Sequence, residues 1–183
     1  MQQNYKSVEV SQVVISELML PSHSNFNGKI HGGYILSLLD QIAFACASKH
    51  SRAYCVTASV DTVDFLKPIE IGELVTMKAS VNYVGRSSMV IGIRVESENI
   101  QTGAIKHCNS SYFTMVAKDK EGNSIEVPGL VLKSDDEIRR FAKSIKRKEM
   151  KDFRVNEFHE TDFASEKYLH ILEDHKAKIE MHS

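Results

Sequence analysis

The sequence predicts an α+β fold in which a curved antiparallel sheet wraps around one long central helix. Residues 31–48 form the one strongly apolar, helix-like segment, and segments rich in Val and Ile lie on both sides of it. A sheet of this composition must bury one face, and the segment 31–48 is apolar enough to cover that face. Because the turns between the later strands are short, we expect antiparallel hairpins.

The N-terminal part contains a strand, a loop and the central helix. Residues 8–20 alternate loosely between apolar and polar and predict a strand, and residues 21–30 hold the Pro, Ser, Asn and Gly of an ordered loop. The helix at 31–48 has apolar residues on nearly every face, which is typical of a buried helix.

Four further strands are predicted after the helix. They lie at residues 54–65, 74–84, 88–98 and 106–116, and turn signals separate them at residues 68–72, 85–87 and 101–103. The open edges of such a sheet would be satisfied by pairing with a second subunit.

The sequence changes character after Met115. We therefore expect a first domain at residues 1–130 and a basic helical C-terminal extension at residues 131–183. Ser134 and Glu137 predict a helix start, as N-cap and capping-box partner, with a basic amphipathic helix to about residue 151. Residues 165–179 form either a second helix or a partly disordered segment.

Composition limits the partners and the compartment. The 183 residues carry a formal net charge of −1, so no global field favours nucleic acid or a membrane surface. Cys46, Cys55 and Cys108 form no Cys-x-x-Cys pair, which indicates a reducing compartment, and the scattered histidines predict no metal site.

No targeting or membrane segment is evident in the sequence. The first ten residues lack the apolar stretch of a signal peptide, and the longest apolar-rich segment, residues 34–47, is shorter than the roughly 20 residues that span a bilayer. We expect a cytoplasmic protein with no nucleic-acid or membrane partner.

His31, Gly32 and Gly33 open the central helix. The first amides of a helix have no intrahelical partner and carry the positive end of its dipole, so they could polarise a carbonyl or stabilise an oxyanion. The alternative is that the glycines only allow close packing of helix against sheet.

Asp40 interrupts the apolar helix, and Asn25 lies in the loop before it. A buried, unpaired carboxylate costs several kcal/mol or takes up a proton, so Asp40 indicates either a functional group or an ion pair at a subunit interface. Asn25 and Asn27 are either functional or cap the loop backbone.

Three stretches resemble the hotdog-fold acyl-CoA thioesterases, and among them the cytosolic acyl-CoA hydrolase group with its single-domain bacterial relatives. They are Asn25 to Gly33 continuing to Asp40, Asp64 to Leu74, and Val84 to Met89. Together they cover about residues 10–117 in the family's order and spacing. The fold that the resemblance implies is the hotdog fold, whose curved sheet around a central helix matches the prediction above.

The resemblance also implies a role for individual residues. Asp40 matches the catalytic carboxylate, and Asn25 matches a catalytic asparagine that acts from the partner subunit. Gly33, with His31 and Gly32, matches the helix N-terminus that polarises the thioester carbonyl. A hairpin that contributes to the coenzyme A site is matched by Gly85, Arg86, Ser87 and Ser88.

The resemblance further implies an acyl-CoA substrate, a dimer, and a hexamer built as a trimer of dimers. No separate cofactor is expected, because coenzyme A is part of the substrate and the product. For the phosphates of coenzyme A, Arg86 is the first candidate cation and the basic helix at residues 139–148 is the second.

Asp40 could act in two ways, as a general base on water or as a nucleophile that forms a mixed anhydride. The sequence lacks a Gly-x-Ser-x-Gly elbow, which disfavours a serine hydrolase. Two other functions stay open: a non-catalytic acyl-CoA-binding protein, and a hydroxyacyl-thioester dehydratase that would use a catalytic histidine such as His31.

Overall fold

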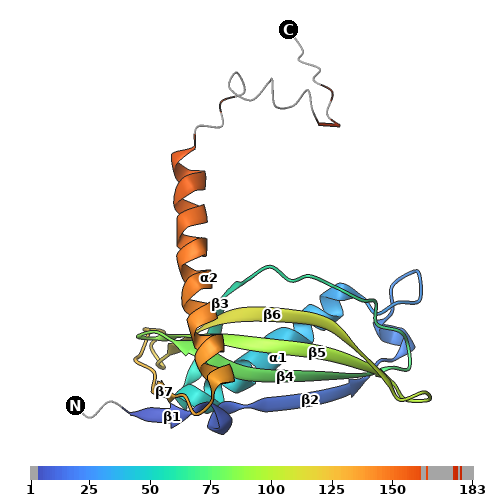
Figure 1. Ribbon diagram of the computed structural model, residues 1–183, viewed down its shortest axis with the longest axis horizontal. Coiled ribbons are helices and arrows are strands. Elements are labelled where there is room, and N and C mark those ends of the chain that lie inside the picture. Colours follow the sequence, from blue (N-terminus) through green and yellow to red (C-terminus); the bar gives the residue numbers. More distant parts are fainter. Residues whose placement is uncertain (1–3, 162–163, 165–174, 177, 179–183) are drawn as a thin grey trace. The chain divides into compact units, whose positions relative to one another are not determined.

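The computed structural model describes residues 4–161, 164, 175–176 and 178 of the chain. The main sheet has five antiparallel strands in the order β2-β4-β5-β6-β3, and α1 lies against one of its faces (Figure 1). The elements are β1 (Tyr5–Ser7), η1 (Val8–Ser11), β2 (Val13–Leu18), η2 (Pro21–His23), α1 (Gly32–Ser51), β3 (Tyr54–Val60), β4 (Leu74–Val84), β5 (Ser88–Asn99), β6 (Ala104–Lys118), β7 (Gly129–Val131) and α2 (Asp135–Glu160). The predicted hotdog fold is confirmed.

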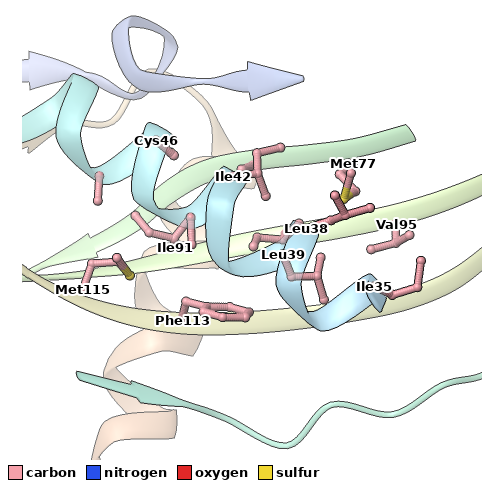
Figure 2. Close-up of a cluster of buried hydrophobic side chains, with 14 of the residues drawn as sticks. Ile35, Leu38, Leu39, Ile42, Cys46, Met77, Ile91, Val95, Phe113 and Met115 are labelled. Carbon is pink, nitrogen blue, oxygen red and sulfur yellow. The ribbon is translucent and has the colours of Figure 1, made fainter. Parts of the chain in front are cut away.

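The hydrophobic core lies between α1 and the sheet (Figure 2). Ile35, Leu39 and Ile42 of the helix are buried at the spacing of one helical face, and they pack with residues such as Ile91 and Phe113 from the middle strands. Because α1 contacts all five strands, its orientation on the sheet is fixed along its whole length.

Two predicted strands are shorter than expected. Residues 8–11 form the 3-10 turn η1 instead of the start of a strand, and the Ser11 hydroxyl donates to the Val8 carbonyl at 3.0 Å. The strand predicted at 54–65 ends at Val60, after a register shift between Thr57 and Ser59. Beyond it, residues 61–66 run beside β6.

The helix predicted at residues 134–151 continues to Glu160. Ser134 is its N-cap, as predicted: the Glu137 N–H donates to Ser134 Oγ at 3.3 Å, while the Glu137 carboxylate accepts the Lys133 N–H at 2.6 Å. The second helix predicted at residues 165–179 falls almost entirely outside the described residues.

The chain divides into two compact units, Met1–Ile145 and Lys146–Ser183. The predicted domain boundary at residue 130 lies inside the first unit. The strand β7 spans that boundary and pairs with β1 in a two-stranded parallel sheet, and beyond it the Phe141 ring packs on Tyr83 with centroids 5.1 Å apart. Residues 131–145 therefore pack with the first unit.

Candidate active site

Asp40 lies on the exposed face of α1, and its predicted burial is wrong for the single chain. Residues 39 and 42 point into the core, and Asp40 points about 100° away from residue 39 around the helix. The same exposed face carries Gly33, Ser37 and Phe44. The carboxylate therefore avoids the cost of burial because α1 buries only the face that meets the sheet.

The Thr57 hydroxyl holds the Asp40 carboxylate from the neighbouring strand. Its Oγ1 donates to Asp40 Oδ1 at 2.5 Å, from the edge strand β3. Both residues line a groove of about 540 Å³, whose other walls include Phe44, Tyr54 and Met115. The sequence does not predict a role for Thr57. Its strand also contains Ser59, and nothing in the sequence indicates which hydroxyl would bind Asp40.

The N-terminus of α1 is closed by the His31 side chain. The Gly33 N–H donates to His31 Nδ1 at 2.9 Å, and the Tyr34 N–H donates to the His31 carbonyl at 3.0 Å. The expectation of a free Gly33 amide is therefore wrong here. The Gly32 N–H has no hydrogen-bond acceptor among the described residues, and the Phe65 ring lies close beside Gly32.

The Asn25 side chain organises its own loop. Its Oδ1 accepts the N–H groups of Asn27 at 2.9 Å and of Lys29 at 3.1 Å, and the backbone N–H of Asn25 donates to the Lys29 carbonyl at 2.6 Å. The loop-capping role considered for Asn25 is thus observed. Its Nδ2 amide group makes no hydrogen bond to any described residue, so the side chain still has two N–H donors to offer.

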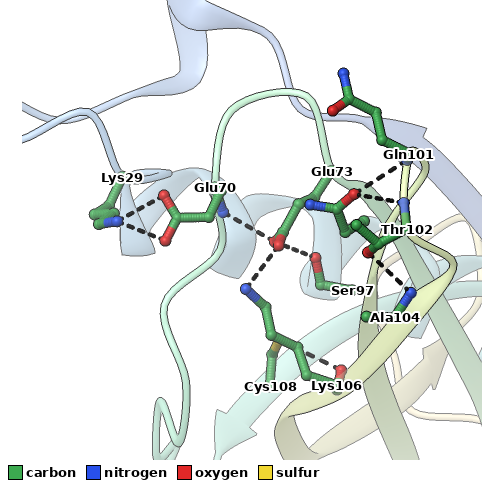
Figure 3. A network of polar contacts seen from close by, with 10 residues as sticks. Lys29, Glu70, Glu73, Ser97, Gln101, Thr102, Ala104, Lys106 and Cys108 are labelled. Carbon is green, nitrogen blue, oxygen red and sulfur yellow. Dashed lines mark hydrogen bonds and ion pairs between the residues drawn. The ribbon is translucent and has the colours of Figure 1, made fainter.

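A polar network anchors the Asn25 loop to the sheet (Figure 3). Lys29 Nζ contacts both carboxylate oxygens of Glu70, at 2.5 and 2.6 Å, and the Glu70 N–H donates to Glu73 Oε2 at 3.0 Å. Glu73 is 5% exposed and also receives Ser97 Oγ at 2.6 Å and Lys106 Nζ at 2.7 Å. Burial raises the pKa of the Glu73 carboxyl, but these donors outweigh burial and lower the pKa overall.

Residues 85–88 form the tight turn between β4 and β5. The Gly85 N–H donates to the Ser88 carbonyl at 2.8 Å, and the Ser87 carbonyl accepts the Ala117 N–H at 3.0 Å. The Arg86 side chain is exposed and makes no ion pair with any described residue. It is therefore free to bind an anion.

The competing cations on α2 are partly neutralised. Both Arg139 and Arg140 pair with the carboxylate of Asp136, the latter at 2.6 Å. This pairing favours Arg86 over the start of the basic helix as a phosphate ligand.

The described part of the chain contains neither a candidate metal site nor a candidate membrane-spanning helix. Among these residues, no group of three or more His, Cys, Asp or Glu side chains is placed to hold a metal ion. None of the described helices is both long and apolar enough to cross a bilayer.

Comparison with known proteins identifies the family. Residues 27–104 match the model of the Thioesterase superfamily. Protein VdlD of Helicobacter pylori is 45% identical over 141 residues, which is 77% of this chain and 80% of that protein. The acyl-CoA thioester hydrolase YkhA of Bacillus subtilis, described as uncharacterized, is 38% identical over 128 residues, 70% of this chain and 74% of that protein. The chain belongs to the thioesterase superfamily.

Solved members of this thioesterase superfamily share the fold closely. An apo-hexameric acyl-CoA thioesterase matches with a TM-score of 0.81 at 35% identity, over 83% of this chain and 97% of the other. The Staphylococcus aureus acyl-CoA hydrolase in complex with butyryl coenzyme A, coenzyme A and coenzyme A disulfide matches with a TM-score of 0.78 at 31% identity, over 93% and 99%. That enzyme has also been solved as single alanine variants of an asparagine, an aspartate and a threonine.

The structure brings some of the expected site residues together and leaves others apart. His31 and Gly33 form one cap, whereas Asp40 is hydrogen-bonded to Thr57, which the sequence did not predict as a site residue. Asn25 forms its hydrogen bonds within its own loop and makes none to Asp40.

Proposed function

We propose that the protein hydrolyses acyl-CoA thioesters to a free acid and coenzyme A, with Asp40 as the reacting carboxylate. The observation that carries this proposal is the Thr57–Asp40 bond at the mouth of a groove. The hydroxyl holds Oδ1, while Oδ2 has no hydrogen-bond partner among the described residues. A carboxylate held at one oxygen and open at the other can take a proton from water or attack a carbonyl itself.

Asn25 supplies a hydrogen-bond donor to the thioester. Because its Oδ1 already accepts two backbone N–H groups, the group that it presents is the Nδ2 amide. Such a donor stabilises the negative charge that develops on a carbonyl oxygen. The asparagine, aspartate and threonine that were changed in the Staphylococcus enzyme have the same sequence separations as Asn25, Asp40 and Thr57, which supports these assignments.

The amides at the start of α1 complete the oxyanion site. The Gly32 N–H has no acceptor within the described residues, and the Gly33 N–H becomes available when the His31 ring turns aside. Among the described residues that line the groove, Asp40 is present and no histidine is, which disfavours a dehydratase that would use a catalytic histidine such as His31. The coenzyme A thiolate is a good leaving group, since thiol pKa values are about 8.5.

Coenzyme A is held through Arg86 in the turn Gly85 to Ser88, where the exposed guanidinium pairs with phosphate. The subunits form a dimer along the open edge of β3, beside Asp40, and dimers assemble into a hexamer such as that of the related thioesterase. The cytoplasmic location, and the expectation that the protein uses no cofactor and has no nucleic-acid or membrane partner, stay predictions.

Replacement of Asp40 by Asn tests the function. Asp40→Asn keeps the shape and an acceptor for Thr57 but removes the base, so thiol release should fall by about two to four powers of ten. Asp152→Asn, the same change at an exposed carboxylate on α2, is the matched control and should keep full activity. Turnover near wild type in Asp40→Asn would overturn the assignment, and no thiol release by the wild type would indicate a binding protein.

The two chemical routes through Asp40 differ in where the oxygen of water first appears. In a single turnover in oxygen-18 water, the label enters the Asp40 carboxylate only if Asp40 forms the anhydride and water then attacks Asp40 Cγ, so that the acid leaves with the former Asp40 oxygen. If Asp40 is a general base, the label appears only in the released acid.

A further inference from the structure

We infer that Phe44 and Tyr54 together limit the length of the acyl chain, so that this site prefers short acyl groups. The inference rests on the proposed function, since it concerns the substrate of the Asp40 site. Its basis is the shape of the groove, in which the reacting carboxylate and the two aromatic rings share one cavity.

The two rings close the groove one helical turn beyond Asp40. Phe44 follows Asp40 by four residues on the same exposed face of α1, about 6 Å further along the helix axis. Tyr54, at the start of β3, packs edge-on against Phe44 with centroids 5.9 Å apart and planes at 61°. Phe44 is 41% exposed and Tyr54 63% exposed, so neither ring is explained by burial in the core.

The groove that contains Asp40 extends in one direction along α1. Of the helix residues, Asp40, Gln41 and Phe44 line it, and none of its lining residues lies nearer to the start of the helix than Asp40. Towards the end of the helix the groove is lined by Phe44, Tyr54 and Met115. Burial of apolar surface therefore favours a substrate whose acyl chain follows α1 towards Phe44.

The spacing of Asp40 and Phe44 along the axis of α1 gives the scale of that length. An extended polypeptide advances about 3.6 Å over the three backbone bonds of a residue, which is about 1.2 Å per bond. An extended acyl chain advances by a similar amount, so 6 Å corresponds to about five of its carbon atoms. Beyond the rings lies a second groove of about 860 Å³, lined by Ala53, Ile125 and the turn at residues 118–122. Tyr54 and Val56 line both grooves, so the Tyr54 ring acts as a wall between them.

The test is a chain-length profile of kcat/KM, measured by thiol release from acetyl-, butyryl-, hexanoyl-, octanoyl- and lauroyl-CoA. The wild type should fall off beyond hexanoyl-CoA. Phe44→Ala and Tyr54→Ala should each raise the ratio of octanoyl-CoA to butyryl-CoA by at least about tenfold, since a pocket discriminates about that much per methylene group. Phe44→Trp should lower the ratio of hexanoyl-CoA to butyryl-CoA.

Phe153→Ala is the matched control, because Phe153 is an exposed ring on α2 and lines neither groove. Its ratio should equal that of the wild type, and a shift there as large as at Phe44 would overturn the inference that the rings of the groove set the length. Unchanged ratios in both ring variants, with an active wild type, would overturn the inference alone. A wild type inactive on every substrate would overturn the proposed function and the inference with it. If an alanine variant fails to fold, Phe44→Leu and Tyr54→Leu test the same ratio.

Discussion

The bond between Thr57 and Asp40 fixes both the position of the carboxylate and the oxygen that remains open. A hydroxyl that donates to an ionised carboxylate forms a short, strong bond, and here the two oxygens are 2.5 Å apart. Thr57 therefore holds Asp40 Oδ1 and leaves Oδ2 without a hydrogen-bond partner among the described residues. It is a positioning residue in this proposal.

Replacement of Thr57 by Val separates this role from packing. Val keeps the branched shape but has no donor, so kcat should fall by about 10- to 100-fold, the equivalent of one hydrogen bond to a charged group. The KM for butyryl-CoA should change little, and Thr57→Ser should restore most of the turnover. If Thr57→Val had the kcat of the wild type, or if Thr57→Ser had a kcat as low as that of Thr57→Val, the hydroxyl of Thr57 would not position Asp40.

At the scale of elements, Glu73 joins the loop at residues 66–73 to β5 and β6. Its carboxylate receives three donors: the Glu70 N–H, Ser97 and Lys106. Glu70 in turn binds Lys29 in the loop that carries Asn25. The buried carboxylate is thus the fixed point of a chain of contacts that ends at a proposed catalytic loop.

Glu73→Gln should lower the free energy of unfolding by about 2 kcal/mol at pH 7, as for loss of charged hydrogen bonds in a buried site. The lowered folded-state pKa means that this stabilisation is complete above the unfolded pKa of about 4.3 and is lost as pH falls through the folded pKa. Urea unfolding of wild type and variant from pH 7 to pH 3 measures the difference between their free energies of unfolding, which should become smaller as the pH falls. Glu70→Gln, in a more exposed pair, should cost at most about 1 kcal/mol. If the difference between wild type and Glu73→Gln did not change with pH, the ionised Glu73 carboxylate would not be the stabilising group.

The sequence predicts elements well where the determinants are local. The strands β4, β5 and β6 and the N-cap Ser134 were predicted to within a few residues, because alternation and turn chemistry act over short distances. The early end of β3 depends on its pairing with β6, and no local pattern encodes it.

In the candidate site, too, the sequence predicts the features that depend on local sequence and misses those that depend on tertiary packing. Its segment was found because Asp40 is conspicuous in an apolar helix and the surrounding motifs resemble the family. Thr57 was missed because its bond to Asp40 depends on how β3 packs beside α1. The His31 cap was missed because a side-chain rotamer decides whether the Gly33 N–H is free.

At the scale of the whole molecule, Asn25 is neither hydrogen-bonded to Asp40 and Thr57 nor among the residues that line their groove. Asp40 and Thr57 face the groove beside β3, an edge strand with exposed Tyr54 and Val60. Asn25 is fixed within its own loop and makes no hydrogen bond to either of them. A second copy that pairs along β3 would cover the groove and could bring its own Asn25 to it.

Mixing two inactive variants tests this arrangement. Asn25→Ala and Asp40→Ala homodimers should each be nearly inactive, because every site lacks one group. After joint unfolding and refolding at equal amounts, about half of the dimers are mixed, and each mixed dimer has one site with both changes and one intact site. Activity should therefore recover to about a quarter of that of refolded wild type. Recovery cannot occur if Asn25 and Asp40 of the same chain form the site, since each chain then carries a defect in its own site. A mixture that stays inactive, while a mixture of either variant with wild type gives the expected intermediate activity, would place the whole site within one subunit.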